Sequence, residues 1–164
     1  MNKKFSVLIN KRINKFNKTI LVESDKSISH RALLISSQCI GLSHLHGILE
    51  SEDVNNTINC LKKLGVKIIK KNKKYIVYGN GLGSFKKPNK NQLYAGNSGT
   101  LARMLIALLS TQSNLKIKIV GDSSLNKRDM GRVIEPLSKI GCNFYPKGKL
   151  NLPITIEGTN MPLA

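Results

Sequence analysis

The segment from Asp25 to Arg31 combines a carboxylate with a lysine, serines and an arginine, and either Ser24 or Asp25 can cap the predicted helix. Lys26 and Ser27 fall at the predicted N-terminus of a helix, where free backbone N–H groups and the helix dipole favour an anion. Arg31 follows Ser27 by one helical turn and therefore shares its face. An ammonium, a hydroxyl and a guanidinium directed at one volume suit a phosphate or a carboxylate. An ordinary capped helix with an exposed lysine and arginine is the alternative.

The segment from Gly96 to Thr100 precedes a second predicted helix. Its two glycines allow the backbone to approach a ligand closely, and its small polar residues leave amide donors free. The spacing is neither that of a Walker A loop nor that of a hydrolase nucleophile elbow, so a plain turn and helix cap is the alternative. Arg103 is the one charge in the apolar helix that follows, and we expect it to be paired or to face a ligand.

The segment from Gly121 to Arg132 gathers Lys127, Arg128 and Arg132 beside a turn and a helix start. This cluster is typical either of an anion clamp or of a solvated basic loop.

Other candidate residues are weaker. His44 and His46 share one face of a predicted strand, but a metal site needs a third ligand. The three cysteines stand in apolar or helical runs and are predicted to lie in the core. Within these segments no pair of carboxylates is spaced for acid–base catalysis.

The elements that must position these residues form a repeat. In each half, a polar turn leads into an apolar helix, followed by a strand, an amphipathic helix and two further strands. We interpret this series, with one strand before it, as a β-α-β-α-β-β unit used twice. The amphipathic helices end in the similar runs Leu61–Gly65 and Leu137–Gly141, each with a glycine suited to a helix C-terminus. Pro136 is unfavourable within the last helix unless that helix begins near Ile134 and the proline lies in its first turn.

The composition narrows the class of protein. A chain of 164 residues with 40% hydrophobic residues suits about one α/β domain, and no apolar run approaches the ~20 residues of a membrane span. The formal net charge of +18 reflects either a general bias toward lysine or an attraction for anions. Aromatic residues make up only 5% and tryptophan is absent, which disfavours nucleic-acid recognition. Three cysteines indicate a reducing compartment rather than a disulfide scaffold.

Taken together, the segments resemble the 3-phosphoshikimate 1-carboxyvinyltransferase family, also called 5-enolpyruvylshikimate-3-phosphate synthases. The resemblance runs from about Ile20 to the C-terminus, and family members are more than twice as long as this chain. It implies an incomplete α/β fold, the inside-out α/β barrel of enolpyruvyl transferases, with residues 1–17 as a strand segment of the other lobe, 18–90 as the first unit and 91–164 as the second. The matching segments are Asp25–Arg31, Leu49–Thr57, Gly96–Thr100 with Arg103, and Gly121–Pro136.

The resemblance also implies roles for individual residues. Lys26 is expected to contact both phosphoenolpyruvate and shikimate 3-phosphate, while Ser27 and Arg31 hold the shikimate moiety. Three further residues are expected to receive phosphoenolpyruvate: Asn97, Gly99 and, as a charged clamp, Arg128. The catalytic acid–base residues are expected outside this chain, which would then supply part of the active site and be inactive alone.

The implied reaction belongs to the shikimate pathway. The enolpyruvyl group of phosphoenolpyruvate is transferred to the 5-hydroxyl of shikimate 3-phosphate by addition and elimination, with release of phosphate. The resemblance implies no metal or other cofactor, no nucleic-acid or membrane partner, a cytoplasmic location, and a monomer at full length.

Two positions depart from the family pattern. Ser24 replaces a glycine, and Asp129 replaces a proline after Arg128, where its carboxylate is expected to compete for the guanidinium. Two alternative functions remain: the related UDP-N-acetylglucosamine enolpyruvyl transferase, whose reactive loop cysteine has no counterpart here, and a basic nucleic-acid-binding module.

Overall fold

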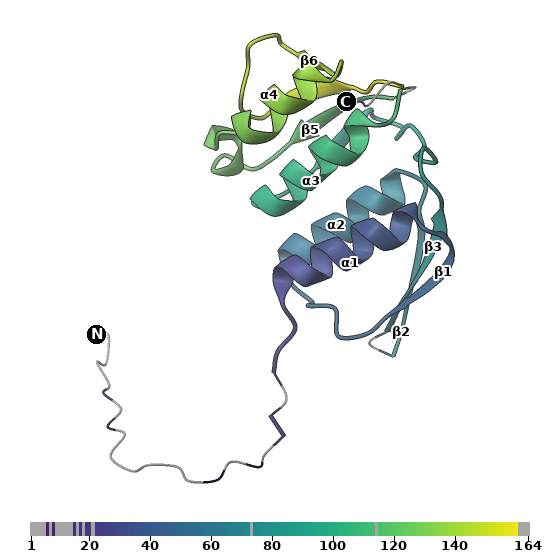
Figure 1. Cartoon of the computed structure of the whole chain (residues 1–164), viewed down its shortest axis with the longest axis vertical. Coiled ribbons are helices and arrows are strands. Elements are labelled where there is room, and N and C mark those ends of the chain that lie inside the picture. Colours follow the sequence, from purple (N-terminus) through teal and green to yellow (C-terminus); the bar gives the residue numbers. More distant parts are fainter. Residues whose placement is uncertain are drawn as a thin grey trace.

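The helices lie in the middle of the molecule and the strands lie on either side of them (Figure 1). The structure, a computed structural model, describes residues 22–72, 74–113 and 115–160, together with residues 6, 8, 15, 17, 19 and 20. The strand segment expected within residues 1–17 therefore lies outside the described ranges apart from four isolated positions. The helices are α1 (Lys26–Gln38), α2 (Glu52–Lys63), α3 (Gly99–Ser110) and α4 (Gly131–Lys139), with the short 3-10 helix η1 (Leu125–Lys127) before α4.

The strands form two sheets. The first has three antiparallel strands in the order β1-β3-β2, namely β1 (Ile40–Leu45), β2 (Lys67–Lys71) and β3 (Lys74–Asn80). The second has four strands in the order β4-β5-β7-β6, namely β4 (Gln92–Tyr94), β5 (Lys116–Val120), β6 (Asn143–Tyr145) and β7 (Ile154–Glu157). Only β4 and β5 are parallel in this second sheet.

Three strands of the second sheet match the three strands of the first, which confirms the repeated α/β architecture. The pairs β1–β3 and β2–β3 match β5–β7 and β6–β7 in order and direction. In the second unit β4 covers the outer edge of β5, whereas no strand among the described residues covers the corresponding edge of β1. The six-element unit is therefore complete only in the second half of the described chain.

The repeated helix endings also appear as predicted. Gly65 has φ +89° and its N–H donates to the carbonyl of Lys62 at 3.0 Å; Gly141 has φ +95° and donates to Ser138 at 3.2 Å. This left-handed conformation carries little penalty for glycine and closes each helix before a strand.

One apolar core joins the two units. It includes the fully buried Leu33, Leu61 and Val77 of the first unit and Leu105 and Ile117 of the second. The apolar helix α3 is buried on most sides, and it contacts both α1 and α4. None of the helices in the described part of the chain is long and apolar enough to cross a membrane.

Two expectations about local structure are wrong. α4 begins at Gly131 rather than near Ile134, so Pro136 stands inside the helix instead of in its first turn. The buried side chains of Met130 and Ile134 hold this helix start in the core, and the N–H of Ile134 donates to the carbonyl of Met130 at 3.0 Å. Cys39 is exposed because α1 ends there, whereas Cys60 and Cys142 are buried as predicted.

Candidate active site

The N-terminus of α1 carries the first predicted anion-binding group. Asp25 is extended, and its carboxylate accepts a hydrogen bond from the N–H of Ile28 at 2.6 Å, which fixes the helix start immediately before Lys26. The Lys26 ammonium lies 2.9 Å from the Asp53 carboxylate, with the lysine side chain 50% exposed and the aspartate 21%. Lys26 is thus oriented by a carboxylate of the neighbouring helix α2 and is still accessible to solvent.

Asp53 belongs to the N-terminus of α2. Ser51 caps this helix by accepting from the N–H of Val54 at 3.4 Å, so Asp53 falls in the first helical turn. Sequence reasoning did not assign Asp53 to the site, because an acidic residue in a first turn is explained by the helix dipole alone. The ion pair places the N-termini of α1 and α2 next to each other.

The turn before α3 carries the second group. Ser98 caps α3 by accepting from the N–H of Leu101 at 3.3 Å, and the N–H of Ser98 donates to Ala95 at 3.1 Å. The carbonyl of Gly96 accepts from the N–H of Asp122 at 2.8 Å, which joins this turn to the segment that leads to Arg128.

Arg128 lies against this turn. Its guanidinium donates to the side-chain oxygen of Asn97. A Cβ built on Gly99 would lie 3.4 Å from Nη1 of Arg128 and 3.0 Å from Nη1 of Arg103, so a glycine leaves room for two guanidinium groups. The structure therefore brings together the three residues expected to receive phosphoenolpyruvate.

Arg103 is paired with backbone rather than with a carboxylate. Its guanidinium donates to the carbonyl of Asp129 at 3.0 Å and to that of Gly99 at 3.5 Å. These contacts satisfy the expectation that a charge in this apolar helix is paired, and they leave its positive charge uncompensated by any ion pair within the described residues. Two arginine charges thus stand beside one glycine at the start of α3.

The expected competition between Asp129 and Arg128 is wrong. The Asp129 carboxylate accepts from the N–H of Gly131 at 2.8 Å, where α4 begins, and it forms no ion pair with Arg128 in the described structure. A carboxylate at a helix N-terminus is stabilised by the free N–H groups there, which draws Asp129 away from the guanidinium.

His30 is a further residue of this region that sequence reasoning missed. Its imidazole is fully buried between α1, α2 and the turn before α3. Nδ1 lies 2.6 Å from Oγ1 of Thr57 and Nε2 lies 3.3 Å from Oγ of Ser98. Burial lowers the pKa of His30 below its ordinary value, with Asp53 opposing and Lys26 assisting this shift.

Ser27 and Arg31 form no hydrogen bond or ion pair within the described residues, so their predicted roles stay predictions. Ser27 is half-buried in the first turn of α1. Arg31 is exposed and lines an apolar groove of about 440 Å³ between α1 and α3, together with Leu34, Ile35, Gln38, Leu82, Met104, Ala107 and Leu108.

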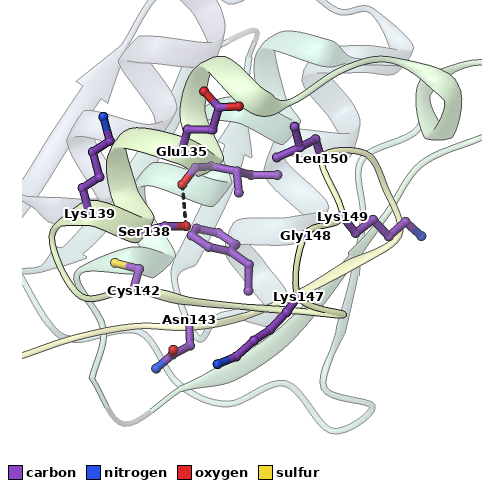
Figure 2. A pocket seen from close by; sticks show the side chains of 11 residues that line it. Glu135, Ser138, Lys139, Cys142, Asn143, Lys147, Gly148, Lys149 and Leu150 are labelled. Carbon is purple, nitrogen blue, oxygen red and sulfur yellow. Dashed lines mark hydrogen bonds between the residues drawn. The ribbon is translucent and has the colours of Figure 1, made fainter.

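The hollow between α4, β6 and the following loop offers a less suitable place for an anion. This pocket of about 500 Å³ contains the lysines Lys139, Lys147 and Lys149, but Figure 2 shows their side chains pointing away from one another. The hydroxyl of Ser138 donates to the carbonyl of Ile134 at 2.8 Å and is thus engaged within the helix. Convergent cations are found at Gly99, not here.

The remaining candidates show no grouped ligands. Among the residues that the structure describes, no three His, Cys, Asp or Glu side chains are gathered so that they could hold a metal ion. His44 lies on β1 and His46 follows that strand, and both are exposed. Burial raises the pKa of the Cys60 thiol to about 11, which keeps it protonated near neutral pH.

Comparisons with known proteins identify the family to which the chain belongs. Residues 10–163 match the family model for EPSP synthase (3-phosphoshikimate 1-carboxyvinyltransferase). The 3-phosphoshikimate 1-carboxyvinyltransferase of Oenococcus oeni is 43% identical over 148 residues, which are 90% of this chain and 33% of that protein. The enzyme of the same name from Endomicrobium trichonymphae is 44% identical over 151 residues, or 92% of this chain and 35% of that protein.

A solved structure of similar fold extends the comparison to three dimensions. EPSP synthase from Acinetobacter baumannii aligns with a TM-score of 0.78 at 36% identity, covering 85% of this chain and 31% of that chain. This chain thus spans about a third of the length of the relatives that it matches. Because the family model matches nearly the whole chain, this protein belongs to the EPSP synthase family.

Proposed function

We propose that this chain provides part of the substrate-binding site of a 3-phosphoshikimate 1-carboxyvinyltransferase. The observation that carries the proposal is the position of Arg128, hydrogen-bonded to Asn97 and placed beside Arg103 at Gly99, where α3 begins. Two guanidinium groups at a helix N-terminus suit a doubly charged phosphate ester that also carries a carboxylate, as phosphoenolpyruvate does.

Each predicted residue has a place in this proposal. Lys26 reaches toward both substrates from the start of α1, and Ser27 and Arg31 on the same helix hold the shikimate moiety. Phosphoenolpyruvate lies at the start of α3, against Asn97, Gly99 and Arg128.

In this proposal the cationic groups bind and orient the two substrates and do not transfer protons. Both substrates are anions that repel each other, and fixed cations offset this repulsion and hold the 5-hydroxyl of shikimate 3-phosphate near the enolpyruvyl carbon. Addition forms a tetrahedral intermediate, and elimination of phosphate completes the transfer. The proposal assigns the acid–base steps to residues outside this chain and needs no metal or cofactor. It includes a cytoplasmic location and a monomer at full length.

The apolar groove between α1 and α3 has a role in the same proposal. Six of its eight lining side chains are apolar, and Ile35 is 64% exposed there. Family members are more than twice as long as this chain, and we propose that a further part of the full-length enzyme covers the groove beside Arg31.

A titration followed by NMR tests the binding proposal on this chain. Phosphoenolpyruvate and shikimate 3-phosphate should each cause saturable shifts of the amides of Lys26, Asn97 and Gly99. Arg128→Gln should weaken phosphoenolpyruvate binding by about tenfold or more, because a charge-assisted hydrogen bond is lost. Lys139→Gln removes the same charge from the pocket of Figure 2 and should change the affinity by less than about twofold.

Two results would contradict the proposal. Equal losses in the two variants would indicate a general attraction of anions to a basic surface. Salt-sensitive binding of an oligonucleotide that shikimate 3-phosphate does not displace would favour the nucleic-acid module instead.

A further inference from the structure

His30 connects the two helix starts that carry the proposed binding groups. It lies on α1, one turn after Lys26, and its imidazole reaches Thr57 on α2 and Ser98 at the start of α3. Ser98 stands between Asn97 and Gly99, and Thr57 stands one turn after Asp53, the partner of Lys26. Within the described chain no other side-chain hydrogen bond joins α1 to the turn before α3.

The hydrogen-bond partners of the two hydroxyls determine which imidazole nitrogen carries the proton. Oγ1 of Thr57 donates its proton to the carbonyl of Asp53 at 3.3 Å, so it accepts a hydrogen bond from Nδ1–H of His30. In a neutral ring protonated at Nδ1, Nε2 is an acceptor, so Oγ of Ser98, which also accepts from the N–H of Leu101, donates its proton to Nε2. Both contacts are satisfied by a neutral imidazole protonated at Nδ1.

We propose that His30, as this neutral Nδ1–H tautomer, is a positioning residue that holds the turn Asn97–Gly99 in register with the N-terminus of α1. The inference rests on the proposed function, because the groups held in register are those assigned to the two substrates. His30 itself is fully buried and touches neither substrate in this proposal. Its effect is to keep Asn97 and Gly99 at a fixed distance from Lys26.

The first measurement is spectroscopic and needs no substrate. A long-range ¹H–¹⁵N correlation spectrum of the chain distinguishes the two neutral tautomers and the imidazolium. The Nδ1–H form is expected at neutral pH. Ser98→Ala should change the ¹⁵N chemical shift of Nε2, and Thr57→Val should change that of Nδ1. An Nε2–H tautomer or a charged ring would overturn the proposal.

The second measurement compares phosphoenolpyruvate affinity among three variants. His30→Asn keeps a polar group near Thr57 but is too short to reach Ser98, and should weaken binding by up to about tenfold, the effect of one lost buried hydrogen bond. His30→Gln places an amide near the Nε2 position and should recover most of that loss. Leu33→Ala, a fully buried apolar position on the same helix, should lower the melting temperature and leave the affinity of the folded protein unchanged.

The outcomes separate the two proposals. If His30→Asn binds like the unaltered chain, or if Leu33→Ala weakens binding equally, the positioning role is wrong. If the unaltered chain fails to bind phosphoenolpyruvate, the proposed function fails instead. The amide shifts of residues 97–99 in His30→Asn then decide the positioning role: displaced amides support it and unchanged amides reject it. A His30→Asn chain that does not fold leaves His30→Gln and Ser98→Ala to decide the same question.

Discussion

The Lys26 ammonium and the Asp53 carboxylate meet at 2.9 Å where α1 and α2 both begin. The pair places a negative charge beside a lysine that is proposed to bind two anions. An exposed ion pair contributes at most about 1 kcal/mol to the free energy of unfolding. The main effect of this pair is therefore on the orientation of Lys26 rather than on the stability of the fold. Asp53 both orients the lysine and competes with its ligands.

Asp53→Asn separates these two effects. The amide can still accept a hydrogen bond from Lys26, while the competing charge is gone. We expect the free energy of unfolding to fall by less than about 1 kcal/mol and phosphoenolpyruvate to bind a few-fold more tightly, as measured by calorimetric titration. Glu52→Gln removes an exposed charge from the same helical turn and serves as the control. Weaker binding in Asp53→Asn would show that orientation outweighs competition.

Gly99→Ala tests the space that the two arginines occupy. Residue 99 is helical, so alanine is compatible with its backbone, but the new methyl group would lie 3.0 Å from Nη1 of Arg103. The Arg103 guanidinium, which stands beside Arg128, must therefore shift by a few tenths of an ångström. We expect phosphoenolpyruvate affinity to fall by about tenfold, ~1.4 kcal/mol, with little change in melting temperature.

A double-mutant cycle with Arg103→Lys provides the control for that prediction. If the methyl group acts by displacing the Arg103 guanidinium, the effects of Gly99→Ala and Arg103→Lys should not be additive. Additive losses of phosphoenolpyruvate affinity would show that the methyl group does not act through the guanidinium.

His30 should make stability depend on pH. Its pKa is lowered in the folded protein by burial, so below about 6.5 the unfolded chain binds a proton that the folded chain does not. The free energy of unfolding should therefore fall as the pH drops from about 6.5 toward the lowered value. Urea unfolding at several pH values should show a smaller decrease for His30→Gln, which cannot titrate. Parallel curves for the two proteins would contradict the lowered pKa.

The sequence predicted the local features and missed the contacts between distant segments. The endings at Gly65 and Gly141 follow from residue types within a few positions, and both were found. His30 joins Ser98 over a separation of 68 residues, and Lys26 joins Asp53 over 27, and no local pattern encodes either pair. For Asp129, the sequence suggests a contact with the guanidinium of its neighbour Arg128. In the structure its carboxylate instead accepts from the N–H of Gly131 at the start of α4.

Thiol labelling should distinguish the three cysteines. Cys39 is exposed at the end of α1, whereas Cys60 and Cys142 are buried and donate to the carbonyls of Tyr94 and Ser110. A maleimide at mildly alkaline pH should therefore modify about one thiol per native chain, because burial also raises the pKa of Cys60 to about 11. Cys39→Ser should abolish this labelling, and rapid modification of a second thiol in that variant would show that the core opens.

Pro136 offers a test of the helix start at Gly131. Proline has no N–H to donate to the carbonyl one turn earlier, at Arg132, and Pro136 stands exposed inside α4. Pro136→Ala should therefore stabilise the protein by about 1 kcal/mol, since the added hydrogen bond and helix propensity outweigh the greater entropy of the unfolded chain. Pro88→Ala, at a proline outside the helices, is the control. An unchanged or lower melting temperature for Pro136→Ala would instead support a helix that begins near Ile134, where a proline in the first turn carries no cost.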